Sequence, residues 1–157
     1  MNHLPYLTRC TELAEEAVAA GDKPFGSVLV DRNGTILREE RNRASTCDPT
    51  RHPEFDLARW AGANMTPEDR RHATVYTSGE HCPMCATAHA LAGLGPIVYA
   101  TSTAQLRDWL QELDSTPSPF VSRPIGEVAP EIETIGPFQE FAARIRDLHI
   151  RARSAVS

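Results

Sequence analysis

Two short motifs hold the residues of this chain whose types and spacing best suit chemistry. One runs His-Pro-Glu from His52 to Glu54, and the other runs Cys-Pro-Met-Cys from Cys82 to Cys85. Imidazole nitrogen and thiolate sulfur are ligands that zinc prefers; a structural zinc site uses four such ligands, whereas a catalytic site uses three and keeps a position for water. Three ligands, His52, Cys82 and Cys85, therefore predict a catalytic Zn²⁺ site, and Glu54 is left free to move protons.

Neither motif is specific by itself, because a lone C-x-x-C also occurs in redox motifs and zinc ribbons. A non-catalytic zinc or redox module remains the alternative from another class. It would be favoured by a second C-x-x-C or by a fourth ligand at zinc-finger spacing, and the sequence has neither. The two motifs together form the H-x-E…C-x-x-C signature of zinc-dependent nucleobase deaminases.

The expected reaction is the hydrolytic replacement of an exocyclic amine on a heterocycle. In that chemistry zinc lowers the pKa of a water molecule towards neutrality. Glu54 takes the proton and later passes it to the ring nitrogen and the leaving amine, as a general acid–base group does. Ammonia is then released. No glycine-rich phosphate motif is present.

Apolar periodicity and turn residues predict the elements that must position these motifs. The predicted helices cover residues 4–20, 53–61, 83–91, 103–113 and 137–152. The predicted strands cover residues 25–31, 35–41, 74–78, 96–100 and 131–135. The inward face of the fourth helix is predicted to carry Leu106, Trp109, Leu110 and Leu113. Residues 114–130 contain four prolines and are expected to form a long ordered loop, a kind of segment that is usually functional.

The order of these elements predicts an α/β fold with a mixed five-stranded sheet between helix layers. Asn33-Gly34 is a hairpin turn that makes the first two strands antiparallel. Strands and helices alternate after residue 52, which indicates parallel pairing there. Both chemical motifs come at the start of a helix. Residues 1–157 are expected to form a single domain, since 157 residues suit one core.

Composition restricts the classes of partner. Hydrophobic residues make up 41% and charged residues 24%, which is ordinary for a globular protein, and the net charge is −5. Polyanionic substrates are therefore disfavoured, because proteins that bind nucleic acid usually carry a basic face. No stretch is long and apolar enough for a membrane helix, and no secretory signal is recognised at the N-terminus, so a cytoplasmic location is expected.

The chain resembles the cytidine/deoxycytidylate deaminase superfamily, and within it the branch of guanine deaminase, yeast-type cytosine deaminase and tRNA adenosine deaminase. The resemblance is carried by PFGSVLV from Pro24, by Asn42, by DPTRHPE from Asp48 and by EHCPMCA from Glu80. It implies a three-layer α/β/α sandwich, three zinc ligands and a catalytic glutamate at the positions named above, and a homodimer.

The resemblance also implies roles in substrate binding. Asn42 is expected to grip the edge of the base, and the alternative is a turn residue after a strand. Phe25 is expected to line the pocket, and a role in the core is equally consistent with the sequence. The backbone carbonyl of Glu80 is expected to face the leaving amine, with the side chain uninvolved. The C-terminal helix is expected to cover the pocket or the dimer interface.

Two positions depart from the family pattern. Pro53 stands where relatives mostly have Ala or Gly, whose N–H often hydrogen-bonds the substrate, and proline has no N–H to give. His81 stands where the family usually has Pro. Of the other histidines, His89 is expected to be packed, whereas His3, His72 and His149 are expected at the surface.

The leading hypothesis is the deamination of a small free heterocycle, such as guanine, cytosine, a related triazine or a nucleoside. Adenosine deamination in tRNA is the enzymatic alternative that the same motifs support. The acidic net charge disfavours it, because binding of a folded RNA depends on neutralising its phosphates.

Overall fold

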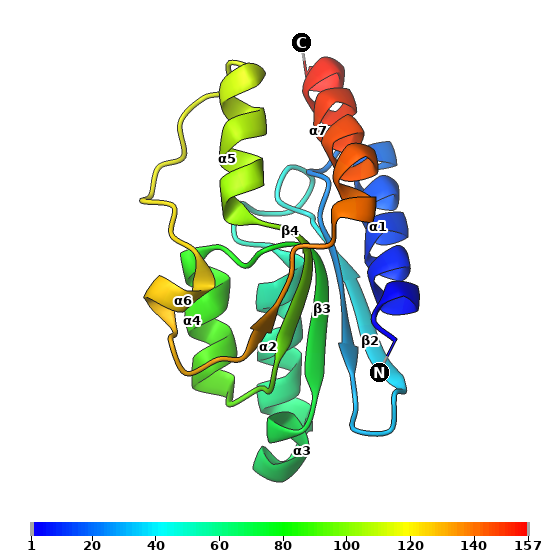
Figure 1. Ribbon diagram of the computed structural model, residues 1–157, viewed down its shortest axis with the longest axis vertical. Helices are drawn as coiled ribbons and strands as arrows, with labels where there is room; N and C mark the ends of the chain where they lie inside the picture. The colour runs from blue at the N-terminus through cyan, green and yellow to red at the C-terminus, as the bar shows by residue number, and fades with distance from the viewer. Residues whose placement is uncertain (1, 157) are drawn as a thin grey trace.

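The computed structural model describes residues 2–156. Its strands are β1 (Gly26–Val30), β2 (Ile36–Arg41), β3 (Thr74–Gly79), β4 (Ile97–Thr101) and β5 (Thr134–Ile135). Its helices are α1 (Leu4–Ala19), α2 (Pro53–Asn64), α3 (Pro67–Arg71), α4 (Pro83–Ala92), α5 (Thr103–Glu112), α6 (Ile125–Val128) and α7 (Ala142–Val156) (Figure 1). Among these helices none is long and apolar enough to cross a membrane.

The strands form one five-stranded sheet in the order β2-β1-β3-β4-β5. β1 pairs antiparallel with β2 and β3, whereas β4 and β5 are parallel to the strands before them. The hairpin between β1 and β2 closes on Asp31, whose carboxylate accepts hydrogen bonds from the N–H groups of Asn33 and Thr35. The predicted mixed sheet, with its antiparallel start and parallel continuation, is confirmed.

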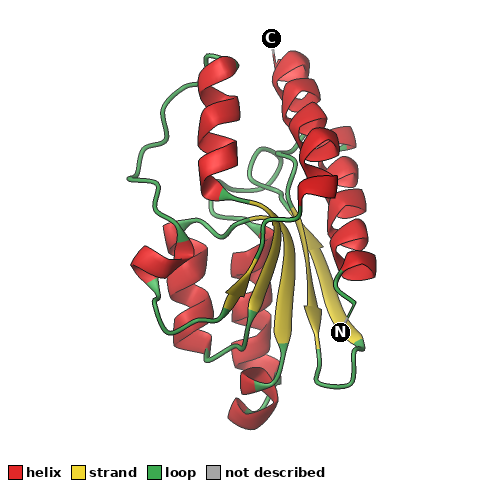
Figure 2. Cartoon of the chain, in the orientation of Figure 1, coloured by secondary structure: helices red, strands yellow, loops and turns green. Residues whose placement is uncertain are grey.

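Helices cover both faces of the sheet, with α1 and α7 on one face and α2 and α4 on the other (Figure 2). The alternation of side chains along a strand decides which layer each residue joins. In β1, Val28 and Val30 pack in the core beneath α1, whereas Leu29 packs beneath α2 with Leu57. The predicted three-layer α/β/α sandwich is therefore confirmed.

Two predicted boundaries near the C-terminus are wrong. Residues 114–130 are not loop throughout, because they include the short helix α6. The last helix does not begin at Pro137. The N–H of Phe138 donates to the carbonyl of Ala100 in β4, so this segment continues alongside the sheet before a 3-10 turn (Gln139–Phe141) leads into α7.

Candidate active site

The two chemical motifs meet because the helices that they begin lie side by side. His52 precedes the first residue of α2, and Cys82 precedes the first residue of α4. Each helix begins with a proline, a residue whose missing N–H costs nothing at that position. The positive ends of both helix dipoles therefore lie near His52 and Cys82, where they favour thiolate sulfur.

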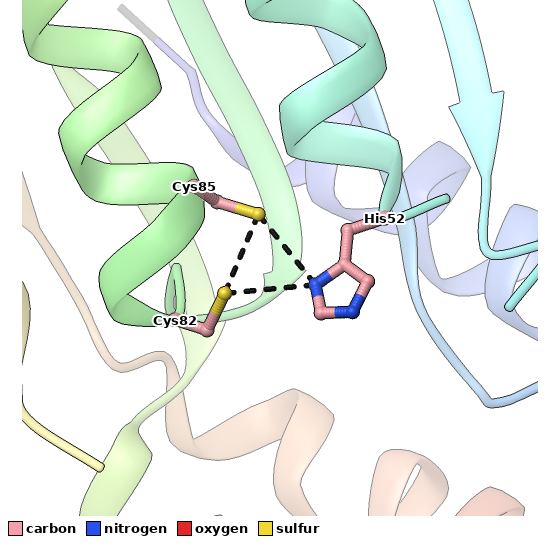
Figure 3. A group of neighbouring side chains, drawn as sticks. All are labelled: His52, Cys82 and Cys85. Atoms are coloured by element: carbon pink, nitrogen blue, oxygen red, sulfur yellow. Dashed lines mark hydrogen bonds between the residues drawn. The ribbon is translucent and has the colours of Figure 1, made fainter. Parts of the chain in front are cut away.

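His52, Cys82 and Cys85 point toward one another at this junction (Figure 3). The Nδ1 atom of His52 lies 3.5 Å from the sulfur of Cys82 and 3.6 Å from that of Cys85. The two sulfurs are 3.5 Å apart. Thus the three side chains that the sequence predicts as ligands form one compact triangle of donor atoms.

The size of this triangle suits a tetrahedral zinc ion. Zinc bonds of about 2.3 Å to sulfur and 2.0–2.1 Å to nitrogen give tetrahedral edges of about 3.8 Å between sulfurs and about 3.6 Å between sulfur and nitrogen. The observed edges lie within about 0.3 Å of these values. Cys85 is the buried corner of the triangle, whereas His52 and Cys82 line an open hollow, so a fourth ligand would approach from the hollow.

The pKa of Cys82 shows that this junction stabilises negative charge on sulfur. Hydrogen bonding with the Cys85 thiol and with His52 lowers the pKa of Cys82 to about 4, against the opposing effect of burial. The pKa of Cys85 is raised by its interaction with Cys82 and by burial. One thiolate therefore forms readily at neutral pH, as metal coordination requires.

Glu54 is the second residue of α2 and is buried beside the triangle. Its Oε1 atom lies 2.9 Å from the hydroxyl oxygen of Thr77 and 3.2 Å from that of Ser27. Burial, followed by the negative charge of Cys82, raises the pKa of Glu54. A carboxyl group that is fixed in position and has a raised pKa suits a group that both takes and returns protons.

A hollow of about 460 Å³ opens in front of the triangle. Its walls come from segments far apart in the sequence. They comprise Lys23, Phe25, Asn42, Pro49, His52, Pro53, Glu54, Glu80, Cys82, Leu106, Leu110, residues 116–120 and His149. The volume lies within the range of small-molecule sites.

Asn42 and Phe25 both reach this hollow, as the sequence predicts. Asn42 is buried just after β2, and its Oδ1 atom accepts a hydrogen bond from the N–H of Ala44, which leaves the amide N–H groups to act as donors. The backbone N–H of Asn42 donates to the carbonyl of Phe25, and this bond places the two residues next to each other. Asn42 therefore lines the hollow, as expected of a residue that binds the base, and it also makes a turn contact after the strand, which was the alternative.

The Glu80 side chain has a structural role that the sequence does not indicate. One carboxylate oxygen accepts from the N–H of Thr103 at the start of α5, and the other accepts from the N–H of Ile125 at the start of α6. This one side chain thus fixes the loop before Cys82 to two segments that approach the hollow. The predicted role of its carbonyl toward a leaving amine stays a prediction.

The histidine in the loop before α4, His81, packs against a histidine of α4, His89. His81 and His89 are buried, and their rings meet edge to face with centroids 5.5 Å apart. The Nε2 atom of His89 lies 2.7 Å from the carbonyl oxygen of Gly95. Burial lowers the pKa of His81 well below its ordinary value and that of His89 to about 4, so both rings are neutral. Packing of His89 was the expectation, and it is confirmed.

The prediction that His149 lies at the surface is wrong. Its side chain is 7% exposed, and it faces the hollow from α7. The expected inward residues of α5 divide between two environments, because Trp109 is buried whereas Leu106 and Leu110 line the hollow. His3 is half-buried and contacts the hydroxyl of Tyr76, and only His72 is exposed as predicted.

Sequence reasoning also missed the partners of Glu54. Ser27 is the polar residue inside the otherwise apolar strand β1, and it pairs with Thr77 of β3. The hydroxyl of Ser27 in an apolar run was the available signal. Only the register of the sheet shows that Ser27 and Thr77 share a face and meet the carboxylate.

Comparison with known proteins gives several deaminases among the relatives. The sequence model of the MafB19-like deaminase family matches residues 1–127. A probable cytosine deaminase from Schizosaccharomyces pombe is 32% identical over 145 residues, which cover 90% of this chain and 88% of that protein. Guanine deaminase from Bacillus subtilis is 39% identical over 102 residues, which cover 64% of this chain and 65% of that enzyme.

A solved structure of Bacillus subtilis guanine deaminase has a TM-score of 0.60 and 29% identity, covering 83% of this chain and 91% of that one. A tRNA-specific adenosine deaminase from Haemophilus influenzae is 35% identical over 92 residues. That match covers 58% of this chain and 53% of the enzyme. These relatives are deaminases by name and differ in the substrates that those names give.

Proposed function

This chain belongs to the MafB19-like deaminase family, and we propose that it is a zinc-dependent hydrolytic deaminase of a small aminated heterocycle. The substrate class that fits is a free base such as guanine or cytosine, or a nucleoside of such a base. The observation that carries the proposal is the triangle formed by His52, Cys82 and Cys85, with edges of tetrahedral length and with Glu54 buried beside it.

Zinc held by the triangle would supply a Lewis acid that acidifies a water molecule. Glu54 takes one proton from the attacking water and delivers it to the ring nitrogen of the substrate, and it then carries the second proton, from the hydroxyl added to the carbon, to the leaving amine. The carbon–nitrogen bond to the amine breaks, a carbon–oxygen bond replaces it, and water plus amine yields a carbonyl plus ammonia. Asn42 donates an amide N–H to the edge of the ring, and Phe25 packs against the ring from the side of the hollow.

Deamination of adenosine in tRNA is the second candidate, and the Haemophilus influenzae relative favours it. The net charge of −5 weighs against it, and Lys23 is the one lysine or arginine among the lining of the described hollow. Binding of a folded RNA draws much of its free energy from phosphate neutralisation. The cytoplasmic location and the homodimer expected from the sequence stay predictions.

The direct test is ammonia release by purified, zinc-loaded protein from guanine, cytosine, their nucleosides and a tRNA with adenosine in its anticodon. We expect release from a base or nucleoside and none from tRNA. Release from tRNA alone, with a salt-dependent gel shift, would replace the proposal with the RNA candidate. Stable zinc without any ammonia release would favour a non-catalytic module.

A further inference from the structure

His149 is a buried imidazole in the wall of the hollow that the mechanism above does not use. It comes from α7, in a part of the chain far from both chemical motifs. Its ring meets the Phe25 ring edge to face, with centroids 5.4 Å apart and an interplanar angle of 72°. Trp109 of α5 contacts it on another side at 6.0 Å. Two aromatic side chains from different elements therefore hold the imidazole in one place.

The ring nitrogens of His149 differ from those of the other buried histidines. Both nitrogens of His81 are sealed from solvent without a partner, and Nε2 of His89 is within hydrogen-bond distance of a carbonyl. Within residues 2–156, no hydrogen bond is made by the His149 ring, yet its nitrogens are not among the sealed atoms. The ring lines the hollow in front of the triangle and a second hollow adjoining it. The nitrogens of His149 are therefore not sealed, and the ring borders the hollow where a substrate would lie.

The chemistry of this ring is that of a neutral imidazole. Burial lowers the pKa of His149 to about 4. At neutral pH one ring nitrogen donates a hydrogen bond and the other accepts one. An aromatic residue without nitrogens would pack equally well between Phe25 and Trp109. It would also avoid the cost of burying a polar group that has no partner.

Several other polar groups in the lining are already hydrogen-bonded within the protein. Both carboxylate oxygens of Glu80 and the amide oxygen of Asn42 accept hydrogen bonds from backbone N–H groups. Pro53 has no N–H to offer. His149 thus adds to the lining a buried group that can both donate and accept a hydrogen bond.

We propose that His149 is a specificity-determining residue that hydrogen-bonds the edge of the heterocycle held over the triangle. The inference rests on the proposed deaminase function and deepens it. His149 selects heterocycles that direct a polar edge at α7 over rings of the same shape that lack such an edge. The last helix therefore takes part in recognition through this side chain.

The experiment compares His149→Phe and His149→Gln with the wild type. The Phe variant keeps the ring and its aromatic contacts but removes the nitrogens, whereas the Gln variant keeps a donor and an acceptor. We expect the Phe variant to lose about tenfold or more in kcat/KM on the best substrate, mostly through KM, and the Gln variant to recover part of the loss. Zinc content and Tm should not fall. His72→Phe, which alters an exposed histidine outside the hollow, is the matched control and should change nothing.

Binding is measured as well, by calorimetry in a Glu54→Gln background in which the substrate stays intact. Adding His149→Phe should raise the Kd by about the same factor as it raises KM. Unchanged Kd and unchanged kcat/KM ratios across the panel would overturn the inference and leave the proposed function standing. A loss of affinity that appears only together with a lower Tm would also overturn it, by assigning His149 a structural role. Wild-type protein that neither binds nor deaminates any heterocycle would overturn the proposed function and this inference with it.

Discussion

The two sides of the hollow are built in different ways. We name one side the metal wall, which comprises His52, Glu54 and Cys82 at the surface of the hollow and Cys85 behind them. We name the other side the covering wall, which comprises Leu106, Leu110, residues 116–120 and His149. The metal wall comes from two adjacent helix starts and is buried or half-buried, whereas residues 116–120 of the covering wall are exposed. We infer that the metal wall performs the chemistry and the covering wall selects what reaches it.

Loss of a metal ligand should have the largest effect. Cys82→Ala removes one corner of the triangle, and the two donors left cannot hold zinc in a three-ligand catalytic site. We expect less than one zinc per chain and no detectable ammonia release, measured by elemental analysis and an ammonia assay. Cys47→Ala is the control, because Cys47 is an exposed free cysteine outside the triangle, and it should keep both. Full zinc content in the Cys82 variant would show that the triangle is not the metal site.

The next effect should come from Glu54→Gln, which keeps the shape of the side chain and removes its ability to carry a proton. Groups that act in general acid–base catalysis contribute about 10²–10⁴-fold, so kcat should fall by this factor while zinc content stays the same. Glu68→Gln, at an exposed carboxylate of α3, should leave kcat unchanged. A Glu54 variant that retains more than about a tenth of the wild-type rate would contradict the assignment.

Pro53→Ala probes the boundary between the two walls. Pro53 lines the hollow without an N–H, and alanine would restore a donor there. A buried hydrogen bond of this kind changes free energy by about 1–3 kcal/mol, so the ratio of kcat/KM between guanine and cytosine should shift by about tenfold. Pro67→Ala provides the control, because Pro67 also begins a helix but lies outside the hollow. Identical ratios in the Pro53 variant would mean that this position only starts the helix.

Phe120→Ala should have the smallest effect and should act on binding alone. The Phe120 side chain lines the hollow but is 48% exposed, so its removal loses only part of the 1.5–3 kcal/mol that a fully buried aromatic contributes. We expect KM to rise by about threefold to fivefold with kcat unchanged. Leu91→Ala, at an 85% exposed apolar residue of α4, should leave KM unchanged. A fall in kcat for the Phe120 variant would assign this segment to the chemical step.

The sequence was most informative about the metal wall because its residues are close together along the chain. A motif within one helix start brings His52 and Glu54 together by local geometry alone, and a second motif does the same for Cys82 and Cys85. It was less informative about the covering wall, where neither Leu106 nor His149 belongs to a motif. On α5, the helical periodicity placed Leu106 and Leu110 on an inward face but could not show that this face borders a hollow rather than a core.

The sequence by itself determined which residues are the candidate ligands and the candidate proton carrier, as well as the order of the five strands and the mixed sheet. These follow from residue chemistry at short spacing and from periodicity, which act within a few residues. Only the tertiary structure decided that Ser27 and Thr77 meet Glu54, that Glu80 ties α5 and α6 to the metal loop, and that His149 is buried against Phe25. Each of these contacts joins residues more than 20 positions apart, and the register of the sheet and the packing of its helices set such distances.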